Sequence, residues 1–515
     1  MDITYQINRG FDRLEKEDSY SWHWATEKEA ELRIINDSER TWVCDLLFTV
    51  GMPPGVESRS VDIFLNGFRV GNIVHTKFCT ISIILRTGEN KLLRFATQEN
   101  LIQIDSDDRC FAFQLFDFRI EVKEEFILST GLERIQEVQL DLLNQFIKIC
   151  DRYNLKYYAI YGSLLGAVRH QGMIPWDDDI DVAMFRQEYD RFLEIADREL
   201  SKDYYLQIPE KGEECFFGGY AKLRNSNTTA LDQKHIFRNC NQGISIDIFP
   251  LDNLPLEKQK RKYLLKRIEC FQKAFCIKKY GFGGIEKNKE DIIHLVGYWI
   301  LSKIYSDRQL WRKLKEIYDI LSKEDTPIVA ILTRYIQGNN LLFYLKKDFG
   351  EGLQAPFEGL KVRIPVNYIT FLIRHAGQEY MRFPITEQRK PHHWAWWDTK
   401  ESYNRVKERI YRESVGIPVV IYGIGSRTEM YLQDCKDDIE CIIDENPEYQ
   451  GRLYKDILVF PFERLNSFNR DITIIICADD LKTAQRKLYQ EGYCNCKMYI
   501  GRVDSVMINS ADYRE

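Results

Sequence analysis

Three aspartates alternate with other residues in the acidic run Asp177-Asp178-Asp179-Ile180-Asp181. If this run is a strand, Asp177, Asp179 and Asp181 share one face, because side chains of a strand alternate between its two faces. Three carboxylates on one face repel one another strongly unless a cation lies between them. Hard oxygen ligands in this arrangement favour Mg²⁺ or Mn²⁺. Asp178 would point to the opposite face, so it is not expected to be a ligand.

A glycine turn lies a short distance before the acidic run. Gly162 and Ser163 stand between an expected strand, 156–161, and a short expected helix, 164–170. Such a turn lets backbone N–H groups approach an anion, and the start of a helix adds a favourable dipole. The sequence therefore predicts Gly162 and Ser163 as a phosphate-binding part of the substrate site. A phosphate-binding turn followed by carboxylates on a strand indicates phosphoryl or nucleotidyl transfer.

Three regions of different periodicity must position these residues. Residues 1–122 contain short β-branched and aromatic runs separated by turn signals, which predict an antiparallel β-sandwich. Residues 123–414 begin with an amphipathic helix from Leu132 and are mostly helical after the glycine turn. Residues 415–515 alternate strands and helices, as in a small Rossmann-like parallel domain. The predicted fold class is a multidomain α/β protein with a central α+β catalytic domain.

Composition excludes several classes of protein. The 515 residues carry 72 Lys and Arg against 78 Asp and Glu, a net charge of −6, so general nucleic-acid binding is not expected. The 13 cysteines form no CxxC pair, which favours free thiols in a reducing compartment. The first residues do not resemble a secretory signal, and the longest apolar stretch, 292–304, is too short to span a bilayer. We therefore expect a cytoplasmic protein.

The run from Glu133 through Val182 resembles the LicD family of phosphocholine and related phosphotransferases, which includes the fukutin-like proteins. The match includes the helix at the start of this run and the segment GSLLGAVRHQGMIPWDDDIDVAM. Later segments extend the resemblance over about 132–398: KLRNSNTT, GISIDIFP, PFEG and YMRFP. The resemblance implies a nucleotidyltransferase-like fold for the central domain. It also implies Mg²⁺-dependent transfer of a phospho-alcohol, such as phosphocholine or a polyol phosphate, from a CDP-activated donor to a hydroxyl of a surface or capsular glycan, with release of CMP.

The resemblance also implies roles for the carboxylates. Asp179 and Asp181 become metal ligands, Asp247 becomes the third carboxylate, and Asp177 is expected beside the substrate. The residues themselves agree on Asp247, because a lone acid between two isoleucines of an apolar strand is costly unless it is paired or metal-bound. Asp247 could also take the proton of the acceptor hydroxyl.

Basic residues complete the expected substrate site. Lys222 and Arg224 share a face of an extended segment and are expected to clamp the donor phosphates, with surface solvation as the alternative. The resemblance assigns Arg169 a phosphate contact. For His392 and His393, binding of donor or acceptor and a structural role in an aromatic cluster both remain open.

Two other functions remain open at this point. One is a nucleotidylyltransferase that uses a nucleoside triphosphate and releases pyrophosphate, and the other is a non-catalytic glycan-binding scaffold. The sandwich tryptophans could hold acceptor sugars or fill a core. In the last domain, Gly423, Gly425 and Thr428 form an incomplete dinucleotide fingerprint with Asp444 at the end of the next strand, so nucleotide binding and structural packing both remain open.

A basic segment is expected to bring the protein to its acceptor. Residues 256–280 carry nine Lys or Arg against two Glu, and Leu264, Ile268, Phe271 and Phe275 form an apolar stripe. Such a helix can lie on an anionic membrane and reach a lipid-linked glycan acceptor by peripheral contact at the inner membrane face. The alternative is a stripe packed on the domain core with its charges solvated.

Overall fold

The computed structural model describes residues 3–18, 20–104, 107–127, 131–211, 219–231, 240–280, 292–333, 341–391, 396–405, 419–434, 439–470, 472–499 and 508–509. The chain forms two compact units. The first comprises Met1–Glu194, Asp247–Lys266 and Glu316–Pro391, and the second comprises Ile195–Ile246, Arg267–Lys315 and His392–Glu515.

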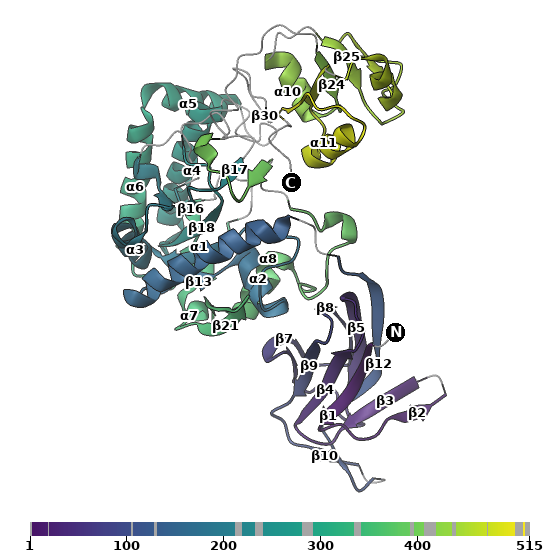
Figure 1. The fold of residues 1–515 in the computed structure, drawn as a ribbon. Helices are drawn as coiled ribbons and strands as arrows, with labels where there is room; N and C mark the ends of the chain where they lie inside the picture. Colours follow the sequence, from purple (N-terminus) through teal and green to yellow (C-terminus); the bar gives the residue numbers. More distant parts are fainter. Residues whose placement is uncertain are drawn as a thin grey trace. The chain divides into compact units, whose positions relative to one another are not determined.

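Two antiparallel five-stranded sheets make up the N-terminal part of the first unit (Figure 1). One sheet has the order β1 (Ile3–Arg9), β4 (Glu29–Asn36), β9 (Asn90–Ala96), β6 (Val61–Leu65) and β7 (Phe68–Ile73). The other has the order β2 (Glu15–Glu17), β3 (Tyr20–Ala25), β12 (Phe113–Glu125), β5 (Trp42–Gly51) and β8 (Lys77–Leu85). A short ribbon joins β10 (Ile102–Gln103) to β11 (Cys110–Phe111). The predicted antiparallel region is confirmed.

Aromatic residues from both sheets fill the space between them. Phe48 of β5 and Phe95 of β9 are buried, and their ring centroids lie 5.4 Å apart in an edge-on arrangement. Trp24 is also buried, and its ring packs against Phe111 at 4.4 Å. Burial of large aromatic rings supplies much of the energy of such a core. For Trp24, the structural alternative is therefore the correct one.

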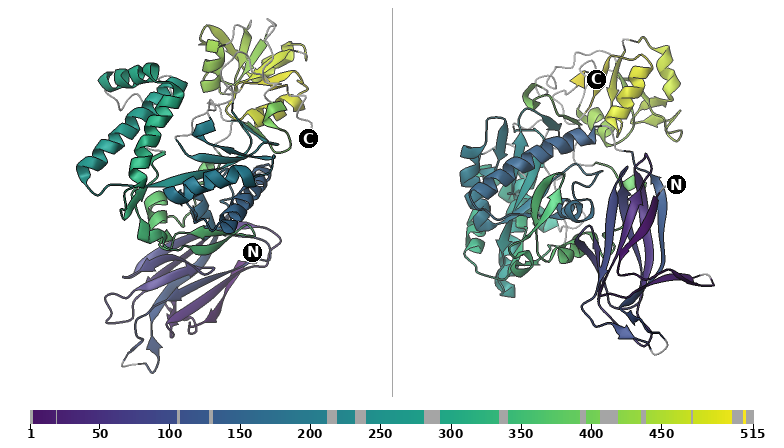
Figure 2. Two further views of the ribbon diagram at one scale, coloured as in Figure 1. Left: turned by 90° about the vertical axis from the view of Figure 1, so that its left-hand side faces the viewer. Right: turned by 60° about the horizontal axis from the view of Figure 1, so that its bottom comes forward.

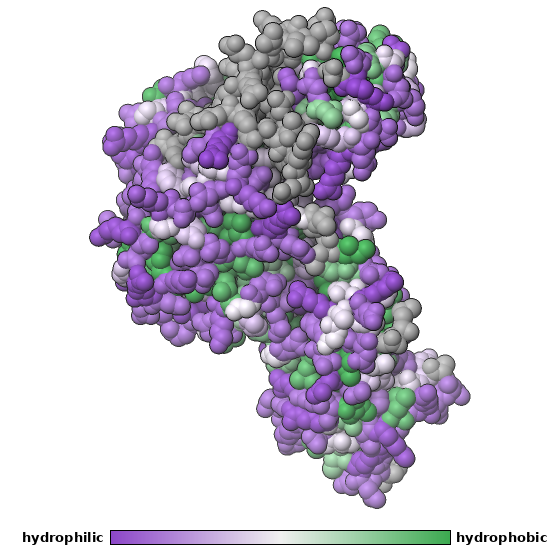
Figure 3. Space-filling model, in the orientation of Figure 1, coloured by the Kyte–Doolittle hydropathy of each residue, from purple (hydrophilic) through white to green (hydrophobic). Residues whose placement is uncertain are grey.

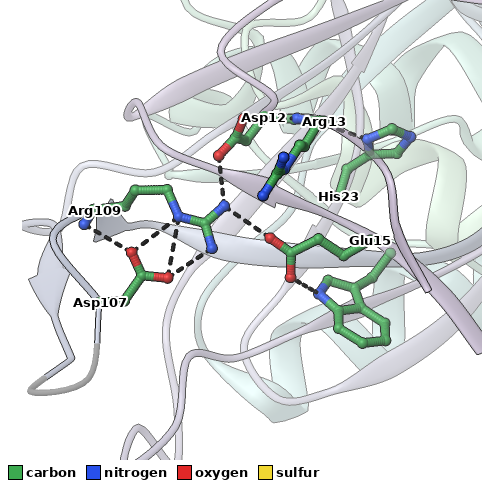
Figure 4. Close-up of polar contacts among 7 residues, drawn as sticks. Asp12, Arg13, Glu15, His23, Asp107 and Arg109 are labelled. Atoms are coloured by element: carbon green, nitrogen blue, oxygen red, sulfur yellow. Dashed lines mark hydrogen bonds and ion pairs between the residues drawn. The ribbon is translucent and has the colours of Figure 1, made fainter. Parts of the chain in front are cut away.

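A network of ion pairs centred on Arg109 joins two segments at one end of the sandwich (Figure 4). The guanidinium of Arg109 contacts Asp12 at 2.5 Å, Glu15 at 2.8 Å and Asp107 at 2.6 Å. Hydrogen bonds from Arg109 lower the pKa of Asp107 to about 2. Trp22 donates its indole N–H to Glu15 at 3.1 Å. This network joins the chain before β2 to the loop before β11.

The rest of the first unit is a mixed α/β body built around a short sheet. Strand β14 (Asp181–Phe185) pairs antiparallel with β13 (Tyr158–Ala159) and parallel with β18 (Ser245–Asn253). On the far edge, β18 continues to β19 (Ile328–Ala330) and β20 (Tyr344–Leu345). Around this sheet the chain forms α1 (Leu132–Arg152), α2 (Tyr161–Arg169), α3 (Arg186–Glu199), α7 (Lys346–Phe349), α8 (Tyr368–Ala376) and the hairpin β21 (Leu353–Phe357) with β22 (Leu360–Ile364).

Hydrogen bonds fix the sandwich to this mixed body. The hydroxyl of Tyr368 donates to the carbonyl of Arg69 at 3.0 Å, and that of Tyr380 donates to the carbonyl of Val70 at 2.8 Å. Arg389 forms an ion pair with Glu124 of β12. The segment 380–389, which carries part of the family resemblance, therefore serves as the joint between the two parts of this unit.

The second unit contains a hairpin, a set of helices and the C-terminal domain (Figure 2). Its hairpin pairs β15 (Tyr204–Gln207) with β16 (Ala221–Asn225). Its helices, among the described residues between β18 and β19, are α5 (Ile292–Ile304) and most of α4 (Lys258–Tyr280) and α6 (Asp307–Ser322). The ribbon of β17 (Thr229–Leu231) and β23 (Trp396–Asp398) places Leu231 and Trp396 in the buried core of the C-terminal domain.

The C-terminal sheet has five parallel strands in the order β27 (Ile457–Phe460), β25 (Ile439–Ile443), β24 (Val419–Tyr422), β28 (Thr473–Ile476) and β29 (Cys496–Met498). Antiparallel β26 (Leu453–Tyr454) and β30 (Ile508–Asn509) flank it, and α10 (Ser426–Asp434) and α11 (Leu481–Gln490) connect its strands. The predicted alternation of strands and helices is confirmed. The domain boundaries at 122 and 414 stay predictions.

Two expectations need correction. Cys240 is disulfide-bonded, so the prediction of free thiols is wrong at this position, whereas ten other cysteines among the described residues are free. The apolar stripe of α4 is largely built into the core, since Leu264, Ile268 and Phe275 are buried. The interpretation of this stripe as a membrane-facing surface is therefore wrong.

Candidate active site

Two carboxylates lie side by side at the start of the parallel strand pair. Asp181, the first residue of β14, is the register partner of Asp247 on β18. Neighbouring strands lie about 4.8 Å apart, and register partners of a parallel pair project to the same face. The side chains are 4 % and 7 % exposed. The fold thus brings together two acids that are 66 positions apart in the sequence and holds them away from bulk water.

The start of α2 contacts this carboxylate pair. The hydroxyl of Ser163 accepts a hydrogen bond from the backbone N–H of Asp181 at 2.8 Å. Helix α2 begins at Tyr161, earlier than expected, so Gly162 and Ser163 lie in its first turn. The first N–H groups of a helix have no acceptor within the helix, and its dipole favours negative charge there. The glycine turn and the acids therefore meet, as the sequence predicts.

The backbone is unusual where α2 begins. Tyr161 has a φ of 48°, in the left-handed region that residues other than glycine rarely occupy. Its ring packs 4.9 Å from His375 and 6.1 Å from Phe249. These aromatic contacts hold Tyr161 at the entry to the helix. Strained backbone of this kind concentrates at functional sites.

The acidic run is a loop rather than a strand. Only Asp181 belongs to β14, whereas Asp177, Asp178 and Asp179 precede it. Helix α1 satisfies the backbone of this loop: Gln136 donates to the carbonyl of Asp177 at 2.8 Å, and Gln139 donates to the carbonyl of Asp178 at 2.7 Å. The predicted strand face of three alternating aspartates is therefore wrong.

Gln136 and Gln139 are positioning residues that the sequence interpretation missed. The available signal was Gln139, a polar residue on the apolar face of α1 that is fully buried. A buried amide needs hydrogen-bond partners, and a loop backbone supplies them. Such a residue on an otherwise apolar helix face indicates an irregular segment packed against that face.

Glycine at position 162 allows the close approach of Asp177. A Cβ added at Gly162 would lie 2.6 Å from Oδ2 of Asp177. The other carboxylate oxygen of Asp177 accepts the backbone N–H of Asp178 at 3.1 Å. The carboxylate of Asp177 is thus held over the first turn of α2, between the turn and the loop.

The donor set suits Mg²⁺, but it does not form a complete protein cage. Asp181 and Asp247 supply hard carboxylate oxygens, and Asp179 lies two positions earlier in the loop. Among the described residues, no group of three or more His, Cys, Asp or Glu side chains is gathered tightly enough to hold a metal ion. Mg²⁺ is commonly bound by one or two carboxylates together with substrate phosphates and water. The Asp181–Asp247 pair fits that mode of binding.

Arg169 lies at the end of α2 and is buried. Its guanidinium donates to the carbonyls of Tyr380 at 2.9 Å and Arg382 at 3.3 Å. Burial, and next the charge of Arg389, lower the pKa of Arg169 to about 9, so it remains a cation at neutral pH. These contacts tie α2 to the joint segment 380–389. A phosphate contact for Arg169 stays a prediction.

Lys222 and Arg224 lie on β16 of the second unit, and both are buried. Arg224 donates to the side chain of Gln207 at 2.7 Å and to the carbonyl of Gly243 at 2.6 Å. These bonds give Arg224 a structural role in the hairpin. The predicted phosphate clamp remains to be tested. His392 and His393 lie outside the described residues.

In the C-terminal domain, the candidate ribose-binding acid bonds to the glycine turn itself. Asp444 accepts the backbone N–H groups of Ile424 at 2.6 Å and Asn446 at 2.8 Å. The hydroxyl of Thr428 donates to the carbonyl of Gly423 at 2.6 Å. These contacts favour structural packing for this motif. They use one of the turn's N–H groups and both oxygens of Asp444.

Comparison with known proteins finds similarity over part of the chain. Residues 154–284 match the family described as LicD/FKTN/FKRP, nucleotidyltransferase domain. The lipopolysaccharide cholinephosphotransferase LicD of Haemophilus influenzae is 29% identical over 265 residues, which are 51% of this chain and 96% of that protein. An uncharacterized protein of Rickettsia prowazekii is 27% identical over 146 residues, 28% of this chain and 47% of that protein.

Solved structures resemble parts of the chain only weakly. A family 35 carbohydrate binding module from Clostridium thermocellum aligns with 22% of this chain and 92% of its own, at 16% identity and a TM-score of 0.14. Part of the secreted serine protease VesC from Vibrio cholerae aligns with 24% of this chain and 25% of its own, at 12% identity and a TM-score of 0.16.

Proposed function

We propose that the protein, whose residues 154–284 match the LicD/FKTN/FKRP family, transfers a phospho-alcohol from a CDP-activated donor to a hydroxyl of a surface glycan and releases CMP. The observation that carries this proposal is the buried pair Asp181 and Asp247, which lie in register on parallel strands. The hydroxyl of Ser163 accepts a hydrogen bond from the backbone N–H of Asp181 beside this pair. Closely spaced carboxylates beside a helix start suit binding of a diphosphate with a divalent cation.

The residues divide the work in the following way. Asp181 and Asp247, with Asp179 nearby in the loop, would hold Mg²⁺ or Mn²⁺, which neutralises the charge of the donor diphosphate when bound. The N–H groups of Gly162 and Ser163 bind an oxygen of the transferred phosphate. The oxygen of the acceptor hydroxyl attacks the phosphorus of the transferred group while Asp247 accepts the hydroxyl proton. The bond between this phosphorus and the CMP oxygen breaks, and CMP leaves.

The related protein from Haemophilus influenzae bears the name of a cholinephosphotransferase acting on lipopolysaccharide. We therefore propose phosphocholine as the first group to test and a lipopolysaccharide-like or capsular glycan as the acceptor. A substrate glycan built on a lipid carrier would place the reaction at the inner membrane face, which is the location we propose.

The test is CMP release by the purified full chain. CDP-choline, CDP-ethanolamine, CDP-glycerol and CDP-ribitol are each incubated with a glycan acceptor and Mg²⁺, and CMP is measured by chromatography. Asp181→Asn and Asp247→Asn should release no CMP above background, whereas Asp325→Asn, a fully exposed carboxylate, should match the wild type. Release of pyrophosphate from a nucleoside triphosphate, with no CMP from any CDP-alcohol, would overturn the proposal and support a nucleotidylyltransferase.

A further inference from the structure

Helix α5 exposes several of its large apolar side chains. Ile293, Val296, Ile300 and Ile304 are 83%, 48%, 43% and 65% exposed. Their spacing of three, four and four residues places them along one stripe of the helix. Trp299 borders the stripe and is 44% exposed. By contrast, hydrophilic residues predominate on the surface drawn in Figure 3.

One side of α5 packs inward, which fixes the orientation of the helix. Ser302 and Tyr298 are buried. From α4, Lys278 donates to the carbonyl of Ser302 at 2.9 Å, and the ammonium of Lys273 lies 5.5 Å from the ring centroid of Tyr298. These contacts hold α5 against α4 through the side that carries Tyr298 and Ser302. The outward stripe is therefore a property of the packed helix.

Space on the outer side of α5 is open at the one glycine of the helix. A Cβ built at Gly297 would meet no atom within 4 Å. Gly297 lies beside Ile293, Ile300 and Ile304 on the helical projection. In the described part of the chain, nothing packs against the helix at this point.

Charge identifies the kind of partner. The described residues 267–278 and 293–315 carry eight Lys or Arg and two Asp or Glu, in a chain whose net charge is −6. Two of these cations form ion pairs, the buried Lys273 with Glu269 and Lys315 with Glu210. Lys303 lies among the exposed apolar residues, with its ammonium 6.0 Å from the ring centroid of Trp299. A tryptophan and a lysine beside an aliphatic stripe are typical of helices that lie at a lipid headgroup boundary. Protein interfaces tend to exclude lysine from their cores.

We propose that α5 docks the protein on an anionic lipid bilayer, with its aliphatic stripe lying in the membrane surface. Its 13 residues span about 20 Å, short of the roughly 30 Å of a bilayer core, so the helix lies along the surface. Among the described residues, no helix is long and apolar enough to cross a membrane. This proposal does not depend on the proposed enzymatic function.

Vesicle co-sedimentation of the full chain tests the proposal. The probes are vesicles of phosphatidylglycerol and phosphatidylcholine at about 3:7, and vesicles of phosphatidylcholine alone, each at low and high salt. We expect binding to the anionic vesicles that weakens with salt. The variant Ile293→Ser/Ile300→Ser/Ile304→Ser should bind at least about tenfold more weakly, because it removes the apolar contact and keeps the charge.

The matched control is Val74→Ser/Ile127→Ser/Leu453→Ser, since these side chains are also exposed but lie elsewhere. It should bind vesicles as the wild type does. Wild-type protein that stays unbound at low salt would overturn the proposal, as would a triple α5 variant that binds normally. A dimer in sedimentation analysis that the α5 variant abolishes, without any vesicle binding, would assign the stripe to a second copy instead. CMP release with a soluble acceptor should be unchanged in the α5 variant. Vesicle binding therefore tests the docking proposal alone, and CMP release tests the proposed enzymatic function alone.

Discussion

Three helical glycines differ in what a methyl group would meet, and this difference predicts three distinct outcomes of substitution by alanine. At Gly297 the added Cβ meets nothing within 4 Å, at Gly162 it lies 2.6 Å from Oδ2 of Asp177, and at Gly166 it lies 2.4 Å from the carbonyl oxygen of Gly172. Alanine is favoured over glycine inside a helix by about 1 kcal/mol. The three sites share this gain and differ in the steric cost.

The expected stabilities follow from what can move. Gly297→Ala should gain up to about 1 kcal/mol of unfolding free energy. Gly166→Ala forces its methyl group into backbone and should lose about 1–3 kcal/mol net. Gly162→Ala meets the end of a side chain, so Asp177 can move away and stability should stay within about 1 kcal/mol of the wild type.

Activity should separate Gly162 from the other two sites. The added methyl group should move the carboxylate of Asp177 by about 1 Å and so change the proposed phosphate site at the first turn of α2. Displacements of about 1 Å can lower a reaction rate about 10²-fold. We expect Gly162→Ala to lose at least about tenfold in kcat/KM for CMP release, with a thermal midpoint near that of the wild type. Gly297→Ala should keep full activity with a soluble acceptor. A Gly162→Ala enzyme with wild-type kcat/KM would refute the assignment of this turn to the substrate site.

Other perturbations have equally definite outcomes. Excess EDTA should stop CMP release, and Asp181→Asn or Asp247→Asn should do so in a folded protein; full activity in EDTA would contradict the metal assignment. Arg186 forms two hydrogen bonds, of 2.7 and 3.0 Å, with the fully buried Asp252. Arg186→Met should lower the unfolding free energy by about 3–5 kcal/mol, because it leaves a buried carboxylate without its cation. The double variant Arg186→Met/Asp252→Leu should recover most of that loss, as measured by thermal unfolding. Burial, with nearby Arg169 next, lowers the pKa of His170; the unfolded chain then binds a proton near pH 6.5 that the folded chain does not, so the unfolding free energy should fall by about 1.4 kcal/mol between pH 7.5 and 5.5. His170→Gln should remove this part of the pH dependence in denaturant titrations, and an unchanged slope would count against a neutral buried histidine.

Local patterns were enough to predict much of this site. The glycine turn and the lone acid in an apolar strand are visible as residue types, and the parallel pairing of β14 with β18 brings Asp181 and Asp247 together as that chemistry requires. The alternation of strands and helices after residue 418 could also be predicted, because strands and helices differ clearly in hydrophobic period and in segment length.

Tertiary contacts decided the features that the sequence could not supply. The acidic run has the alternation of a strand, yet Gln136 and Gln139 bind its carbonyls and hold it as a loop. An apolar stripe does not say what covers it: the stripe of α4 is largely buried, whereas that of α5 is exposed. Hydrophobic periodicity specifies a helix face, and the neighbours of that face determine whether it meets protein or solvent.

The joint between the sandwich and the mixed body restricts how such an enzyme can be cut or recombined. Tyr380 donates its hydroxyl to the sandwich, while its carbonyl accepts Arg169 from the helix that begins with the glycine turn. One residue thus serves both parts. A truncation after the sandwich would strip partners from Tyr368, Tyr380 and Arg389 and expose a surface that the chain normally covers. The sandwich is therefore not an interchangeable module. A protein that exchanged it for another domain would also have to replace the contacts of the segment 380–389 that support α2.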